Sequence, residues 1–103
     1  MNGPDYAARA AAGAEFLDEM RPGWAEQIDL ADLDMGSCYR CVLGQLGGAY
    51  GGTVEDLAID GEDEVQLGFM RLAGEGGHAW QMLREAWTAE IVKRRETTQA
   101  AAP

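Results

Sequence analysis

Histidine and serine, which supply many catalytic bases and nucleophiles, occur once each in this sequence, as His78 and Ser37. General base catalysis needs a base held beside the group that it deprotonates, and no motif ties either residue to such a partner. The glycine-rich run from Gly44 to Gly52 lacks the lysine and the preceding strand of a phosphate-binding loop. We therefore expect no enzymatic activity.

Long apolar runs and basic residues are also scarce. No segment approaches the roughly 20 apolar residues that span a membrane, and the start Met-Asn-Gly-Pro-Asp does not resemble a secretory signal. Eight lysines and arginines oppose eighteen aspartates and glutamates, which gives a formal net charge of −10. Such a charge repels phosphate backbones. We expect a cytoplasmic protein that binds neither membranes nor nucleic acid directly.

Helical periodicity dominates the remaining pattern. Apolar residues recur every three or four positions from Tyr6 to Met20 and from Trp80 to Ile91. Pro22-Gly23 ends the first helix, and Trp24 is expected to fold back onto it. A second helix is expected to run from about His78 to Arg95.

A chain of 103 residues has room for one core. We therefore predict a mainly α fold: a small single-domain bundle of four or five helices over residues 1–95, followed by a disordered tail at 96–103. The stretch from Val65 to Leu72 fits a strand and a helix about equally well. An isolated strand would have no partner, so helix or irregular structure is favoured over a short hairpin.

Two cysteines, Cys38 and Cys41, stand in the run Ser-Cys-Tyr-Arg-Cys-Val-Leu-Gly-Gln-Leu. Ser37 has the chemistry to cap a helix that opens at Cys38, which would place both sulfurs on one face. The favoured interpretation is that both thiols pack in the apolar interior, since buried free cysteine is common.

Two other roles for the cysteines stay open. Zinc prefers four cysteine or histidine ligands, and this chain offers Cys38, Cys41 and His78, with a carboxylate such as Asp34 as a fourth. A homodimer would complete the set with two cysteine pairs around one zinc ion. A thiol redox role is the other alternative, because a helix start and Arg40 both favour thiolate. The βαβ scaffold of thioredoxin-like proteins is not indicated by the pattern.

Acidic residues dominate the middle of the chain, where Arg21 and Arg40 are the only cations between Glu15 and Glu64. A solvated surface explains this pattern without any function. The alternative that we adopt is an acidic surface that binds a basic protein partner. The candidate partner-binding residues are Asp29, Asp32, Asp34, Asp60, Glu62, Asp63 and Glu64.

The motifs Pro22-Gly-Trp, Ile28-Asp-Leu and Ser37-Cys-Tyr-Arg-Cys-Val-Leu-Gly-Gln-Leu together resemble small uncharacterised proteins of actinobacteria and their phages. The resemblance spans about Ala14 to Arg95. It implies a phage or actinobacterial setting, in which the partner would be a basic or DNA-binding host protein, and it carries over no catalytic residue. The acidic turn from Asp60 to Glu64 and the glycine-rich run from Gly74 to Gly77 depart from the pattern.

Overall fold

The computed structural model describes residues 5–71 and 74–101. These parts of the chain form six helices and no strand, so the predicted mainly α fold is confirmed, with more helices than the four or five expected. The helices are α1 (Tyr6–Met20), α2 (Trp24–Gln27), α3 (Val42–Gly47), α4 (Tyr50–Asp56), α5 (Gly61–Gln66) and α6 (His78–Ala101).

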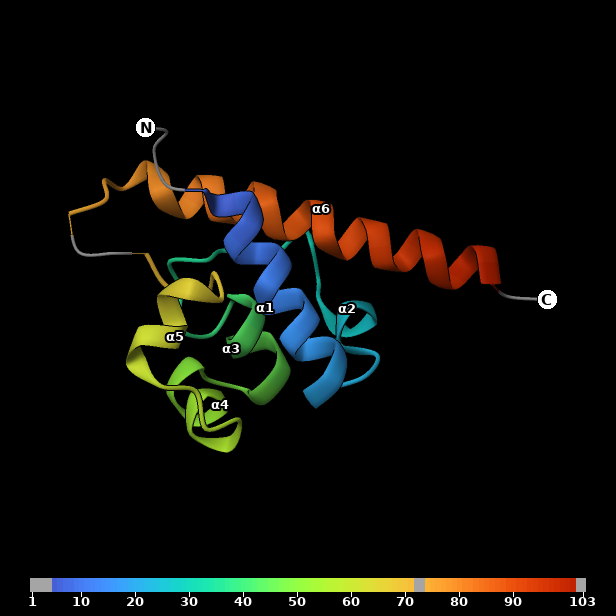
Figure 1. Ribbon diagram of the computed structural model, residues 1–103, viewed down its shortest axis with the longest axis horizontal. Helices are drawn as coiled ribbons and strands as arrows, with labels where there is room; N and C mark the ends of the chain where they lie inside the picture. Colours follow the sequence, from blue (N-terminus) through green and yellow to red (C-terminus); the bar gives the residue numbers. More distant parts are fainter. Residues whose placement is uncertain (1–4, 72–73, 102–103) are drawn as a thin grey trace.

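The two long helices, α1 and α6, pack against each other, and the four short helices gather on one side of them (Figure 1). The radius of gyration is 13.1 Å, close to the ~13 Å of a compact domain of this length. The C-terminal end of α6 extends past the rest of the molecule, which contributes to its longest dimension of 47 Å. No helix among the described residues combines the length and apolar character needed to cross a membrane.

Helix α1 begins and ends as its sequence predicts. The Asp5 carboxylate accepts a hydrogen bond from the backbone N–H of Ala8 at 2.9 Å, which satisfies one of the free donors of the first turn. The helix ends at Met20, just before Pro22, and Gly23 adopts a left-handed conformation with φ of 85°. Trp24 then folds into the core with 1% of its surface exposed, as predicted.

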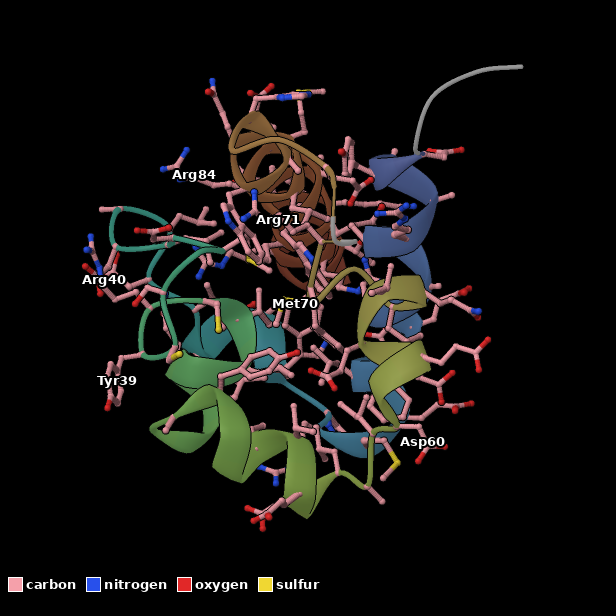
Figure 2. All side chains as sticks on the ribbon, turned by 90° about the vertical axis from the view of Figure 1, so that its left-hand side faces the viewer. Tyr39, Arg40, Asp60, Met70, Arg71 and Arg84 are labelled. Carbon is pink, nitrogen blue, oxygen red and sulfur yellow. The ribbon has the colours of Figure 1, made fainter. Side chains whose placement is uncertain are left out.

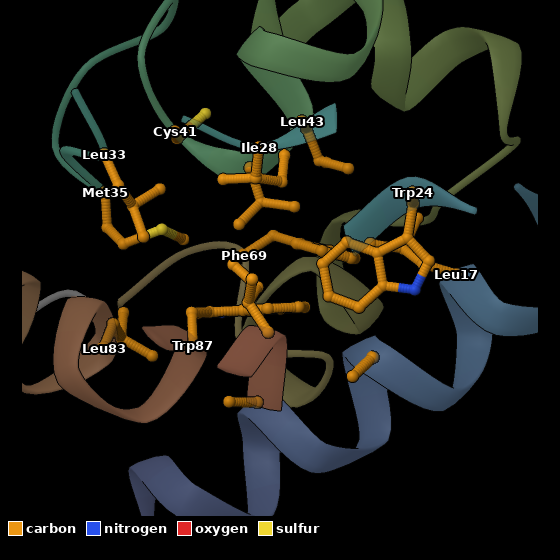
Figure 3. Close-up of a cluster of buried hydrophobic side chains, with 14 of the residues drawn as sticks. Leu17, Trp24, Ile28, Leu33, Met35, Cys41, Leu43, Phe69, Leu83 and Trp87 are labelled. Carbon is orange, nitrogen blue, oxygen red and sulfur yellow. The ribbon is translucent and has the colours of Figure 1, made fainter. Parts of the chain in front are cut away.

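An aromatic cluster forms the centre of the core (Figure 3). The fully buried Trp87 stacks on Phe69 with ring centroids 5.3 Å apart and meets the edge of Trp24 at 5.6 Å. Both indole N–H groups donate hydrogen bonds, because a buried donor needs an acceptor. Trp87 donates to the Gly68 carbonyl at 2.7 Å and Trp24 to the Asp18 carboxylate at 2.9 Å. The cluster thereby joins α1, α2 and α6 to the segment after α5.

Arginines of α6 fix the segment that follows α1. Arg84 donates to the carbonyls of Leu30 and Leu33, and Arg95 donates to the carbonyls of Ala25 and Ile28. These carbonyls lie in or after α2, where backbone acceptors lack helical partners. The guanidinium groups therefore act as caps supplied from a distant part of the chain.

The structure bears on two predicted boundaries. The predicted end of the last helix near Arg95 is wrong, because α6 continues to Ala101 through the first part of the predicted tail. The ambiguous stretch begins in α5, which is helical to Gln66, and Gly68 with φ of 75° turns the chain toward the buried Phe69. Its last residue, Leu72, lies outside the described residues.

Candidate functional site

The cysteine pair stands at the start of α3, but not on one helical face. The helix begins at Val42, Cys41 is its N-cap residue, and Cys38 belongs to the preceding turn. Cys41 is buried with 2% exposure, whereas Cys38 is exposed. The prediction that both sulfurs share the apolar interior is therefore wrong for Cys38 and confirmed for Cys41.

Ser37 explains why the chain turns before it becomes helical. Its hydroxyl oxygen accepts hydrogen bonds from the backbone N–H groups of Tyr39 at 3.3 Å and Arg40 at 3.2 Å. The Cys41 N–H donates to the Ser37 carbonyl, and the Tyr50 N–H donates to the Cys38 carbonyl at 2.7 Å. Serine thus caps a turn here rather than a helix, and the start of α4 closes over that turn.

Cys41 takes the capping role that the sequence assigned to Ser37. Its sulfur accepts a hydrogen bond from the Gly44 N–H at 3.2 Å, within the first turn of α3. Burial raises the pKa of this thiol, although the backbone N–H groups around it act in the opposite direction. Gly44 itself has no room for a side chain, because a Cβ atom there would lie 2.4 Å from the Cys38 carbonyl oxygen.

A small apolar pocket of about 100 Å³ adjoins the exposed cysteine. Its walls come from the cysteine turn, from the segment after α5 and from the two helices α4 and α6; they are Met35, Gly36, Ser37, Cys38, Tyr50, Phe69, Met70 and Trp80. Figure 2 looks toward this side of the molecule, with Met70 near its centre.

Tyr50, which lines this pocket, is also tied to α5. Its phenol donates a hydrogen bond to the Glu64 carboxylate. Burial raises the pKa of Tyr50, and the bond to Glu64 adds to that increase, so the phenol stays protonated. Glu64 is therefore a structural partner of Tyr50 rather than a free surface charge, which the sequence pattern did not indicate.

The described residues do not assemble the predicted zinc ligands within one chain. No three side chains of histidine, cysteine, aspartate or glutamate in this part of the protein come together in a way that could hold a metal ion. His78 is exposed at the first position of α6. A zinc ion shared between two chains stays a prediction.

The predicted partner-binding acids divide into two groups with different roles. The first group lies in the loop between α2 and α3. The Asp29 and Asp34 carboxylates accept backbone N–H groups two residues ahead, at 3.0 Å each, and Asp32 pairs with Arg40 at 3.0 Å. Gln45 completes this loop, because its amide bonds both to the backbone of Asp29 and to the Arg40 carbonyl. These acids thus contribute to the loop structure.

The second group lies at α5, away from the first. Figure 2 places Arg40, the partner of Asp32, and Asp60 toward opposite edges of the view. Asp60, Glu62 and Asp63 are exposed, and none of them pairs with a cation among the described residues. The predicted acidic residues therefore lie on two separate surfaces, and of these residues only Asp32, in the loop, forms an ion pair among the described residues.

A groove of about 620 Å³ lies between the start of α1 and α5. It is lined by Asp5, Ala8, Arg9, Gly61, Glu62, Val65 and Gln66. The α1 residues of this set were not predicted, since no sequence signal links them to a helix so distant in the chain. The groove holds one cation among the described residues, Arg9, which pairs with Glu75 at 3.2 Å.

No protein-family model, curated protein or solved structure matches this chain. The resemblance to small actinobacterial and phage proteins therefore stays a prediction that depends on the motifs themselves.

Proposed function

We propose that this protein binds a basic segment of a protein partner in the groove between α1 and α5. The segment would place an apolar side chain on the floor of the groove and lysines or arginines against its acidic rim. An actinobacterial or phage setting favours a DNA-binding host protein as the source of such a segment.

The combination of apolar and acidic groups in the groove carries this proposal. Ala8 and Val65 supply apolar surface, while the carboxylates of Asp5 and Glu62 lie on the same lining. Burial of an apolar side chain supplies most of the free energy of such contacts, and charges select the partner and speed its approach. A groove with both features fits a basic segment better than it fits a small neutral molecule.

The distribution of cations supports the same partner. Arg84, Arg94 and Arg95 lie on α6 and bond to the segment that follows α1 or to Asp18 and Glu90. Arg9, inside the groove, already has Glu75 as its partner. Asp60, Glu62 and Asp63 form no ion pair among the described residues, so the surface at α5 contributes unpaired negative charge to the formal net charge of −10.

A short peptide with lysines and arginines around a central leucine serves as the test ligand. We expect Glu62→Lys to weaken its binding about tenfold at low salt, because one attractive charge becomes repulsive. Glu55→Lys makes the same change of charge at an exposed site on α4, outside the lining of the groove, and should weaken binding much less. The difference should shrink as salt screens the charges.

Isothermal titration calorimetry at two salt concentrations measures these affinities. Equal affinities for the two variants at low salt would contradict the proposed groove, because general attraction to a negative protein would then explain all binding.

A further inference from the structure

We propose that Cys38 and Cys41 form a reversible disulfide, with Cys38 as the thiol that reacts with other disulfides and Cys41 as the thiol that resolves the product. The proposal concerns a site separate from the groove between α1 and α5 and does not depend on the proposed binding function.

The backbone brings the two cysteines within reach of each other. They lie three positions apart in the turn that the hydrogen bond from the Cys41 N–H to the Ser37 carbonyl closes, and a disulfide joins residues whose Cα atoms are about 4.4–6.8 Å apart. Cys38 also acts electrostatically on the Cys41 thiol, as expected for close neighbours. Gly44 contacts both: its N–H meets the Cys41 sulfur, and its Cα faces the Cys38 carbonyl.

The two thiols differ in access, which assigns their roles. Cys38 is exposed and lines the pocket beside Met35, Met70 and Trp80, so a disulfide in solution can reach its sulfur. Cys41 lies in the hydrophobic core and cannot be attacked from solution without local opening. Burial also raises the pKa of the Cys41 thiol, which disfavours the thiolate that would attack a disulfide from solution.

The reaction is a pair of thiol–disulfide exchanges with a low-molecular-weight disulfide, RSSR. The Cys38 thiolate attacks one sulfur of RSSR, forms a mixed disulfide and releases RS⁻. Cys41 then loses its proton to water or buffer, attacks the Cys38 sulfur and releases the second RS⁻. Each RS⁻ takes up a proton, so that two protein thiols are oxidised and RSSR is reduced to two RSH.

Oxidised glutathione is the probe, added to the reduced full chain, with free thiols then alkylated and the products weighed by mass spectrometry. We expect the wild type to lose about 2 Da and to retain no glutathione, as an internal disulfide requires. Reductant should restore both thiols. A wild type that accumulates a stable glutathione adduct on Cys38, or stays reduced, would overturn the proposal.

Single variants test the order of the steps. Cys41→Ser, which keeps an N-cap side chain, should accumulate the mixed disulfide at Cys38, whereas Cys38→Ser should stay unmodified while it is folded. Circular dichroism confirms the fold of each variant, and Cys41→Ala replaces Cys41→Ser if the serine variant unfolds. Equal rates of modification in folded Cys38→Ser and Cys41→Ser would overturn the assigned roles.

Discussion

Thr53 illustrates at the residue scale how one buried side chain joins two short helices. Only 1% of its surface is exposed, and its hydroxyl donates to the Leu43 carbonyl of α3 at 2.8 Å, with the Ala49 carbonyl 3.0 Å away. The same hydroxyl leaves no room for a side chain at Gly47, because a Cβ atom there would lie 2.0 Å from the threonine oxygen. Thr53 therefore connects α3 and α4 through its side chain.

Thr53→Val keeps the shape of the side chain and removes the hydroxyl. We expect it to lower the free energy of unfolding by about 1–2 kcal/mol, because a hydrogen bond is lost in a buried place. Urea unfolding followed by circular dichroism measures the change. Thr53→Ser keeps the hydroxyl and serves as the control; a valine variant as stable as the wild type would show that the bond contributes nothing.

Asp18 makes a prediction about pH. Its hydrogen bond to Arg94 lowers the pKa of the carboxyl group, and the bond from Trp24 acts in the same direction. A carboxyl whose pKa is lower in the folded state stabilises the fold above its unfolded pKa of about 3.9, and this contribution is lost as the pH falls through the folded value.

Asp18→Asn removes the ionisable group and keeps the size of the side chain. We expect the wild type to be more stable than this variant at neutral pH, and the difference to disappear as the pH falls well below about 4. Chemical unfolding of both proteins across this range provides the measurement. A difference that does not change with pH would mean that the ion pair does not stabilise the fold.

Cysteine placement shows what sequence could and could not predict at this scale. A spacing of three residues is compatible with one helical face and with the two ends of a turn. Ser37 does accept backbone N–H groups, but whether the capped segment is helical depends on contacts with Tyr50 and Gly44. Such contacts involve residues outside the motif, so the motif alone could not decide.

At the scale of elements, the approach of α1 to the segment after α5 depends on a glycine. A Cβ atom at Gly13 would lie 1.9 Å from the Leu67 carbonyl oxygen and 2.7 Å from the Trp87 ring. The backbone of Leu67 and Gly68 therefore packs directly on α1. Trp87 adds the hydrogen bond to Gly68, so three elements meet at this point.

Gly13→Ala should lower the free energy of unfolding by about 1–3 kcal/mol, because the added methyl group forces the packed backbone apart. Gly51→Ala makes the same change inside α4, where nothing lies within 4 Å of the new atom, and should raise stability by about 0.4–1 kcal/mol. Thermal and urea unfolding compare the two variants. If both substitutions shift the free energy of unfolding in the same direction, the backbone of Leu67 does not pack closely against Gly13.

The presence of the two long helices was predictable from local signals, whereas the limits of the short helices were not. Periodicity and the Pro22-Gly23 break are local signals, and α1 follows them. By contrast, Gly51 and Gly52 lie within α4 although glycine is a poor helix former, and this helix begins where the Tyr50 N–H bonds to the Cys38 carbonyl. Short helices are defined by tertiary contacts more than by propensity, so their limits lie beyond the local sequence.

At the scale of the whole molecule, charge and fold are linked through the arginines. Arg84 and Arg95 of α6 bond to backbone carbonyls far away in the chain. Arg94 joins α6 to α1 through Asp18. Cations that hold the fold together in this way leave the acids of α5 without partners among the described residues.

The candidate groove could be predicted only in part. Acidic composition indicated Glu62 and its neighbours, because exposure of charged residues is the usual outcome of folding. Asp5, Ala8 and Arg9 complete the groove from the other end of the chain, and only the packing of α1 against α5 brings them there. Asp29, Asp32 and Asp34 lie in the loop between α2 and α3 and do not line the groove, although the sequence did not distinguish them from the acids at α5.

The most direct test of the proposed binding surface is chemical-shift mapping by NMR. The basic peptide with a central leucine is titrated into the isotopically labelled protein, and the backbone amides that shift are located. The account predicts that the largest shifts gather on Ala8, Arg9, Glu62, Val65 and Gln66, with saturation at one site. Shifts spread evenly over the acidic residues of the molecule, or centred on Asp29, Asp32 and Asp34, would contradict it.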